Sequence, residues 1–125
     1  MKLFRIFSRS AVLAVCTLAM SPGLVSAEHH EAGDARTVEV VAKEFTFEPS
    51  KIEVAPGSRL EIKLVNTGNL SHNLHIAGKG MKTETIQGGS SDSVTVTAPE
   101  NGTLKFFCNV PGHEQAGMTG AIVAR

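Results

Sequence analysis

Short stretches of alternating β-branched and polar residues, separated by glycine and proline, constrain the fold of this chain more than any other feature. From Thr37 onward they read TVEVVAKEFTF, SKIEVAPGSRLEIKLVN, SHNLHIA, SVTVTA, TLKFFC and GAIVAR. A period of two is typical of half-buried β-strands, and no segment shows convincing helical periodicity. The pattern therefore predicts an all-β sandwich or barrel.

The first 27 residues have the character of an export signal. A basic start precedes an uncharged apolar run over residues 11–20, and small residues lead up to Ala27. The apolar run is too short to span a bilayer. Acylation of Cys16 is the alternative, but the bulky Val15 disfavours it. We expect cleavage near Ala27 and a periplasmic or otherwise exported protein.

Behind the signal peptide of residues 1–27, we expect a flexible N-terminal arm over residues 28–36 and one domain over residues 37–125. Cleavage leaves nine Lys and Arg against twelve Asp and Glu, a net charge of −3. This balance argues against a nucleic-acid partner. We also expect no stable membrane insertion of the mature chain. Cys108 remains as its lone cysteine, which in an oxidising compartment indicates a metal ligand.

The spacing of Cys108, His113 and Met118 predicts a copper site. The pattern C-x4-H-x4-M follows an apolar strand, in a loop that contains Pro111 and glycines. A cysteine, histidine or methionine taken alone is ordinarily a core or surface residue. Together they supply a thiolate, an imidazole and a thioether, a set that suits copper better than zinc.

A second histidine completes the trigonal His2Cys plane with a weak axial methionine that blue-copper centres use. In SHNLHIA, His72 shares a strand face with Leu74 and Ile76, whose apolar side chains mark the core side. His75 is predicted to face the other way, together with Asn73, and is interpreted as an outward residue. We therefore predict His72 as the remaining ligand.

These segments resemble the cupredoxins, the family of plastocyanins, pseudoazurins, auracyanins and rusticyanin. The resemblance rests on SHN after an Asn/Gly turn, on FEPSKIEVAPGSRLEIKLVNTG and on FFCNVPGHEQAGMTGAIV, and it covers nearly all of residues 37–125. It implies a Greek-key β-sandwich with a mononuclear copper site at one end and one type 1 copper per chain. The positions that match the family's ligand pattern are His72, Cys108, His113 and Met118.

The resemblance also bears on the surroundings of the ligands. The four-residue gaps on both sides of His113 are closer to auracyanin and rusticyanin than to plastocyanin, and Leu104 stands where many members carry tyrosine. It implies that Asn73 ties its strand to the Cys108 loop. His113 is expected to be the ligand nearest solvent. The apolar residues expected around it are Val110, Pro111, Ala116 and Leu70.

These features predict an exported type 1 copper protein that carries single electrons between redox partners such as cytochromes or a terminal oxidase or reductase. The alternative is a periplasmic cupredoxin of copper tolerance, which binds or oxidises Cu(I). We expect a monomer and no enzyme. Copper oxidases and nitrite reductases need further histidine-rich copper sites, and a binuclear centre needs two cysteines in the ligand loop.

The residues behind the expected cleavage site suggest a second Cu(II) site. A free amine on Glu28, followed by His29 and His30, would offer the nitrogen-rich square-planar geometry that Cu(II) favours. The alternative is a solvated arm whose histidines bind nothing.

Overall fold

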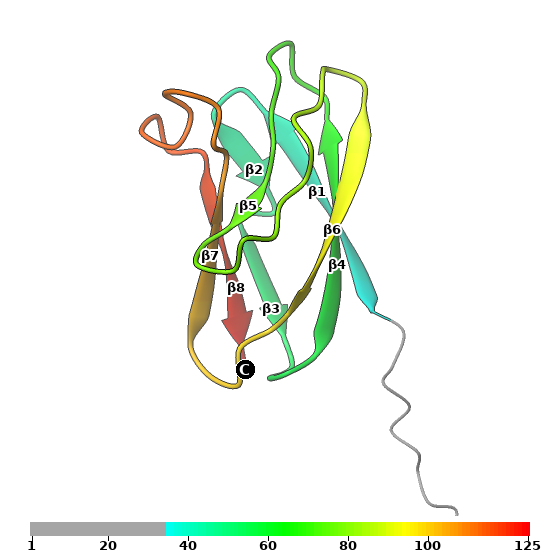
Figure 1. The fold of residues 1–125 in the computed structure, drawn as a ribbon, viewed down its shortest axis with the longest axis vertical. Helices are drawn as coiled ribbons and strands as arrows, with labels where there is room; N and C mark the ends of the chain where they lie inside the picture. Colours follow the sequence, from blue (N-terminus) through cyan, green and yellow to red (C-terminus); the bar gives the residue numbers. More distant parts are fainter. Residues whose placement is uncertain (1–34) are drawn as a thin grey trace, which may run out of the picture.

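The computed structural model describes residues 35–125, which form two four-stranded β-sheets (Figure 1). The strand orders are β2-β1-β4-β6 and β3-β8-β7-β5. The strands are β1 (Arg36–Lys43), β2 (Thr46–Glu48), β3 (Lys51–Val54), β4 (Arg59–Asn66), β5 (His75–Ile76), β6 (Ser91–Thr97), β7 (Thr103–Phe107) and β8 (Thr119–Ala124). Within the described residues, no helix has the length and apolar character needed to cross a membrane.

Several sequence expectations fall in the part of the chain before residue 35. The expected signal peptide, residues 1–27, lies outside the described residues, as does most of the expected arm, residues 28–36. Glu28, His29 and His30 also lie outside them. These three expectations therefore stay predictions.

The chain crosses between the two sheets, which gives the sandwich its Greek-key topology. β1 and β4 are parallel neighbours in one sheet, and β3, which lies between them in sequence, belongs to the other sheet and runs parallel to β8. The remaining neighbours pair antiparallel. The predicted all-β Greek-key sandwich is confirmed.

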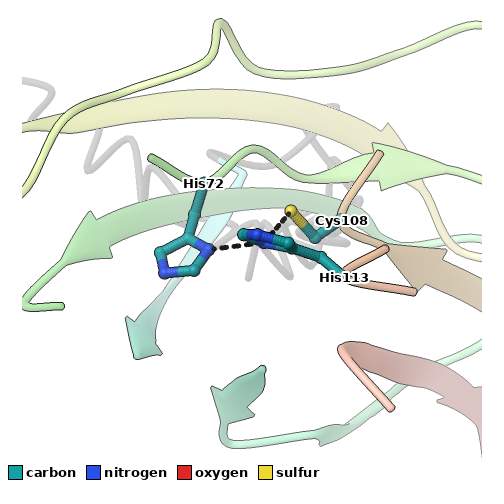
Figure 2. A group of neighbouring side chains, drawn as sticks. All are labelled: His72, Cys108 and His113. Atoms are coloured by element: carbon teal, nitrogen blue, oxygen red, sulfur yellow. Dashed lines mark hydrogen bonds between the residues drawn. The ribbon is translucent and has the colours of Figure 1, made fainter. Parts of the chain in front are cut away.

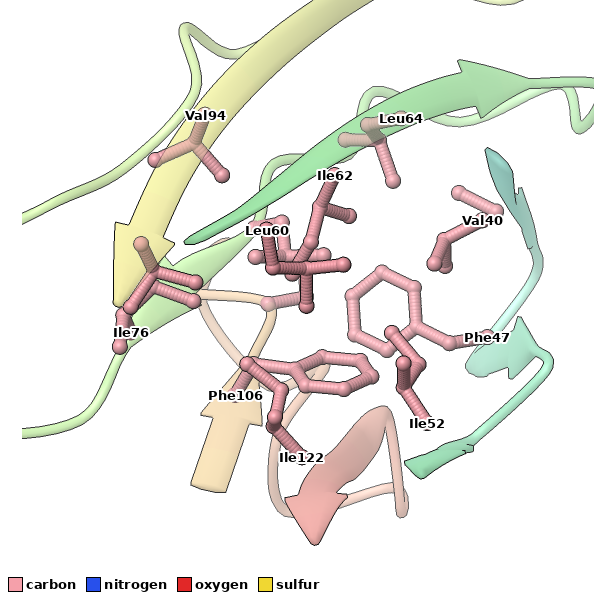
Figure 3. Close-up of a cluster of buried hydrophobic side chains, with 14 of the residues drawn as sticks. Val40, Phe47, Ile52, Leu60, Ile62, Leu64, Ile76, Val94, Phe106 and Ile122 are labelled. Atoms are coloured by element: carbon pink, nitrogen blue, oxygen red, sulfur yellow. The ribbon is translucent and has the colours of Figure 1, made fainter. Parts of the chain in front are cut away.

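The core between the sheets follows from the alternation in the sequence. Leu60, Ile62 and Leu64 of β4 point inward and are fully buried. The other sheet contributes Phe106, which contacts Phe47 edge to face, with 5.4 Å between ring centroids (Figure 3). Burying large apolar side chains from both sheets supplies most of the driving force for folding.

A glycine in β8 leaves room for a core phenylalanine of the neighbouring strand β7. Gly120 is the register partner of Phe106 in β7. A Cβ atom at Gly120 would overlap the Phe106 ring and would lie 2.7 Å from the Ser50 carbonyl oxygen. Glycine is needed here for space rather than for an unusual φ angle.

Two of the predicted strands differ from the observed ones. The stretch TVEVVAKEFTF is divided into β1 and β2 by a two-residue turn at Glu44 and Phe45. In SHNLHIA only His75 and Ile76 form a regular strand. His72 instead makes an isolated antiparallel bridge with Ile86, so the first half of the segment leaves the sheet.

Candidate metal centre

Three of the predicted ligands meet at one end of the sandwich, where the loop after β7 and the segment before β5 approach each other (Figures 1 and 2). The ligand atoms of His72, Cys108 and His113 all lie within 4.8 Å of one another. The two histidine Nδ1 atoms are 3.2 Å apart, and the Cys108 Sγ atom is 3.5 Å from Nδ1 of His113. All three residues are buried.

These separations fit a single metal ion. Two imidazole nitrogens at ~2.0–2.1 Å from one ion, at angles of about 100–120°, lie roughly 3.1–3.6 Å apart. A thiolate at about 2.3 Å from the same ion lies roughly 3.3–3.8 Å from each nitrogen. The observed 3.2 and 3.5 Å fall within these ranges. The donor set, two imidazoles and a thiolate, is the one that copper electron-transfer sites use.

The ligand loop between β7 and β8 is closed by backbone hydrogen bonds. The Cys108 N–H donates to the Met118 carbonyl over 3.1 Å, and the Met118 N–H donates to the His113 carbonyl over 3.0 Å. Gly112 and Gly117 have φ angles of 85° and 102°, which only glycine adopts readily. Met118 is fully buried. The loop thus places Met118 against the two ligands that precede it.

The segment that carries His72 is held by the neighbouring segment and by a buried asparagine. His72 donates its N–H to the Ile86 carbonyl over 3.0 Å, and Ile86 donates back over 2.8 Å. Asn66, at the end of β4, donates its amide to the carbonyls of Ile86 and Leu70. Its side-chain oxygen accepts from the Gly68 N–H. Asn66 was not expected to have this role, and its only signal was that it opens the turn-forming stretch NTGN.

Asn73 links the two segments that carry the ligands. Its side-chain oxygen accepts the Asn109 N–H over 2.7 Å, and its amide donates to the Thr85 hydroxyl over 2.9 Å. The expectation that Asn73 ties its segment to the Cys108 loop is confirmed. The expectation that it faces outward is wrong, because it is 6% exposed. The irregular backbone before β5 breaks the alternation on which that expectation rested.

The electrostatic setting favours neutral imidazole at His72. Burial, and then the nearby His113, lower the pKa of His72, while Glu44 acts in the opposite sense. A metal binds the neutral form of histidine. The Nε2 atom of His72 is buried and has no hydrogen-bond partner among residues 35–125. A tautomer with the proton on Nε2 leaves the Nδ1 lone pair free to bind a metal, next to the Nδ1 atom of His113.

His113 is the more exposed of the two clustered histidines, although only 7% of it is accessible, against none of His72. Of the apolar residues expected around it, Leu70 is 42% exposed, Pro111 and Ala116 are also exposed, and Val110 is half-buried. Phe45 was not expected at the site. Its ring contacts His113 edge to face, with 5.2 Å between centroids and 75° between planes.

His75 takes no part in the cluster. It is half-buried and pairs in register with Phe107, with 5.6 Å between the ring centroids. Among the described residues, the histidines whose donor atoms converge on Cys108 are His72 and His113. The structure thus brings together His72, and not His75, with the other predicted ligands.

A Greek-key sandwich with a buried His2Cys cluster at one end defines a small copper-binding domain of the cupredoxin class. The family model described as the cupredoxin-like domain matches residues 11–124, so the chain belongs to the cupredoxin-like family. The family binds copper, and the site described above can hold one ion.

The chain is similar to a plastocyanin, to a copper-resistant cuproprotein and to the solved structure of an auracyanin. The chain is 34% identical to plastocyanin from Daucus carota, over 61% of this chain and 84% of that protein. It is 25% identical to the copper-resistant cuproprotein CopI from Pseudomonas aeruginosa, over 73% of this chain and 77% of that protein. The solved structure of dithionite-reduced auracyanin from Roseiflexus castenholzii matches with a TM-score of 0.63 and 23% identity, over 74% of this chain and 99% of that one.

Proposed function

We propose that this protein is an exported type 1 copper protein that carries single electrons between redox partners, and not an enzyme. The observation that carries the proposal is the spacing of the donor atoms of His72, Cys108 and His113, buried in a network of backbone hydrogen bonds. When bound, copper supplies a one-electron couple between Cu(II) and Cu(I). A site whose ligands are held in place changes little between the two states.

In this proposal each ligand has its own role. The Cys108 thiolate and the imidazoles of His72 and His113 would hold the copper, and the Met118 thioether would be a weaker donor that tunes its potential. Asn73 keeps the His72 segment fixed to the Cys108 loop through its bond to Asn109.

The ligand assignment is tested by the visible spectrum of the protein loaded with Cu(II). Cys108→Ser should abolish the intense thiolate-to-copper absorption while the far-ultraviolet circular dichroism of the sandwich is retained. His75→Gln is the matched control, because His75 lies outside the cluster, and it should keep the band. Survival of the band in Cys108→Ser would disprove the assignment.

A copper-handling role is the second candidate, supported by the similarity to a copper-resistant cuproprotein. In that role the domain binds or oxidises Cu(I) as part of copper tolerance. Disruption of the gene separates the two candidates. Loss of growth in copper-rich medium with normal respiratory or photosynthetic electron flow favours copper handling. Impaired electron flow with unchanged copper tolerance favours the carrier.

Export belongs to both candidates, and a second copper site at Glu28, His29 and His30 would favour copper handling over the simple electron carrier. Mass spectrometry of the protein recovered from the periplasm should give a chain that begins near Glu28. A titration of that chain with Cu(II) should then saturate at two ions, one of them without thiolate absorption. Deletion of residues 28–30 should remove only this ion. Saturation at one ion per chain, with or without these residues, would reject the site at Glu28, His29 and His30.

A further inference from the structure

The turn between β1 and β2 holds a strained aromatic residue. Phe45 has a φ angle of 61°, and among residues 35–125 it is the one non-glycine residue with positive φ. A bulky residue rarely adopts this conformation, which costs free energy and is most often found where function requires it. The turn therefore holds Phe45 in place against its own backbone preference.

The strained backbone places the Phe45 ring against His113, one of the proposed ligands. The ring is 40% exposed, whereas His113, which it contacts edge to face, is 7% exposed. Leu70 is the other large apolar residue of the described chain with comparable exposure, at 42%. Phe45 thus lies between the His113 imidazole and solvent.

The residue before Phe45 fastens the same turn to the segment that leads to His72. The Glu44 carboxylate accepts the backbone N–H groups of Asn69 and Leu70, the latter over 3.2 Å. A side chain at Gly68 would overlap this carboxylate. These bonds lower the pKa of Glu44, so the carboxylate is charged at neutral pH. The turn therefore contacts His113 through Phe45 and the segment before His72 through Glu44.

We propose that the Glu44–Phe45 turn is a latch over the metal centre. Phe45 covers the His113 imidazole, and Glu44 anchors the turn to the loop before His72. The latch excludes small external ligands and limits the rate at which copper enters and leaves. This inference rests on the proposed copper site, but the position of the latch can be tested in the metal-free protein as well.

The test in metal-free protein is the rate at which diethylpyrocarbonate modifies His113, followed peptide by peptide by mass spectrometry. Phe45→Ala should raise this rate by about two- to tenfold, the factor that corresponds to the loss of one aromatic pair. Modification of His75 in the same sample is the internal reference. Thr46→Ala, which shortens the exposed side chain next to Phe45, should leave the His113 rate unchanged.

The test in copper-loaded protein is the rate of copper removal by a chelator, together with the binding of azide to the Cu(II) form. Phe45→Ala should accelerate removal and admit azide, whereas Phe45→Leu, which keeps an apolar cover, should stay close to the wild type. Glu44→Gln keeps an acceptor for the Asn69 and Leu70 N–H groups and should change removal less than Glu44→Ala.

The outcomes separate the latch from the copper site. If the wild-type protein binds no copper with thiolate absorption, the proposed function fails, and the reaction of His113 in metal-free protein still decides where Phe45 lies. If copper binds as expected but Phe45→Ala matches the wild type in both assays, the latch is refuted while the copper site stands. Circular dichroism of each variant checks that the sandwich is folded.

Discussion

Replacement of Asn66 by alanine should destabilise the metal-free protein by about 2–4 kcal/mol, since each intramolecular hydrogen bond is worth roughly 0.5–1.5 kcal/mol. Asn66 is fully buried and makes bonds to three backbone groups. The Ile86 carbonyl keeps the His72 N–H as a donor after the substitution. The Leu70 carbonyl and the Gly68 N–H lose the Asn66 partner. The cost therefore falls on the turn that precedes His72.

Urea unfolding followed by circular dichroism measures this loss. Asn69→Ala is the matched control, because its side chain lies exposed on the same turn, and it should change stability by less than about 0.5 kcal/mol. A titration with copper should also show affinity weakened by about 10–100-fold in Asn66→Ala, the usual effect of removing a residue that orients a ligand. A stability loss below about 1 kcal/mol in Asn66→Ala would refute the reasoning.

Three further predictions concern the axial ligand, the core and pH. Met118→Gln should keep copper bound and lower the reduction potential measured by voltammetry, because an oxygen donor favours Cu(II); an unchanged potential would leave Met118 as core only. Gly120→Ala should destabilise the protein by about 1–3 kcal/mol through overlap with Phe106, and Phe106→Leu in the same chain should recover part of the loss. Burial, and then Lys82, lower the pKa of His75 from 6.5. The unfolded chain therefore takes up this proton first, so the stability that His75 contributes is complete above about pH 6.5 and is lost as pH falls through the folded pKa. His75→Gln should flatten that part of the pH dependence, and Lys82→Gln should raise the His75 pKa in an NMR titration.

The strands, and the placing of Cys108 and His113 in one loop, were predictable because they depend on local pattern. Alternation in β4 places Leu60 and Ile62 in the core whatever surrounds them. The spacing of Cys108 and His113 within one loop places both donors at the same end of the sheet. His72 was chosen over His75 because it shares a predicted strand face with Leu74 and Ile76. The choice agrees with the cluster, although the backbone at His72 is not a regular strand.

The turn at Glu44 and Phe45 was not predictable from the sequence. KEFTF contains no glycine, proline or asparagine, and phenylalanine favours extended backbone, so the segment looks like one strand. The positive φ of Phe45 is stabilised by contacts with residues far along the chain: its ring touches His113, and Glu44 binds the backbone of Asn69 and Leu70. Tertiary contacts of this kind leave no local pattern.

Asn66 escaped prediction for a related reason. As the last residue of β4 it continues the inward face of the strand, where the pattern calls for an apolar side chain. A buried amide is stable there because the turn after β4 folds back and supplies partners for its oxygen and its nitrogen. The sequence shows the asparagine but not the backbone groups that satisfy it.

The position of Phe45 gives the two candidate functions different physical requirements. An electron can reach a partner that touches the ring over His113 without any atom crossing the cover. If the turn is a latch, a copper ion would leave past His113 only when Phe45 and the Glu44 anchor on Leu70 move. Phe45→Ala should therefore accelerate copper exchange far more than electron self-exchange, measured by NMR line broadening in mixtures of the oxidised and reduced protein. Equal acceleration of both rates would mean that the ring controls approach to the site in general and does not act as a latch on the metal.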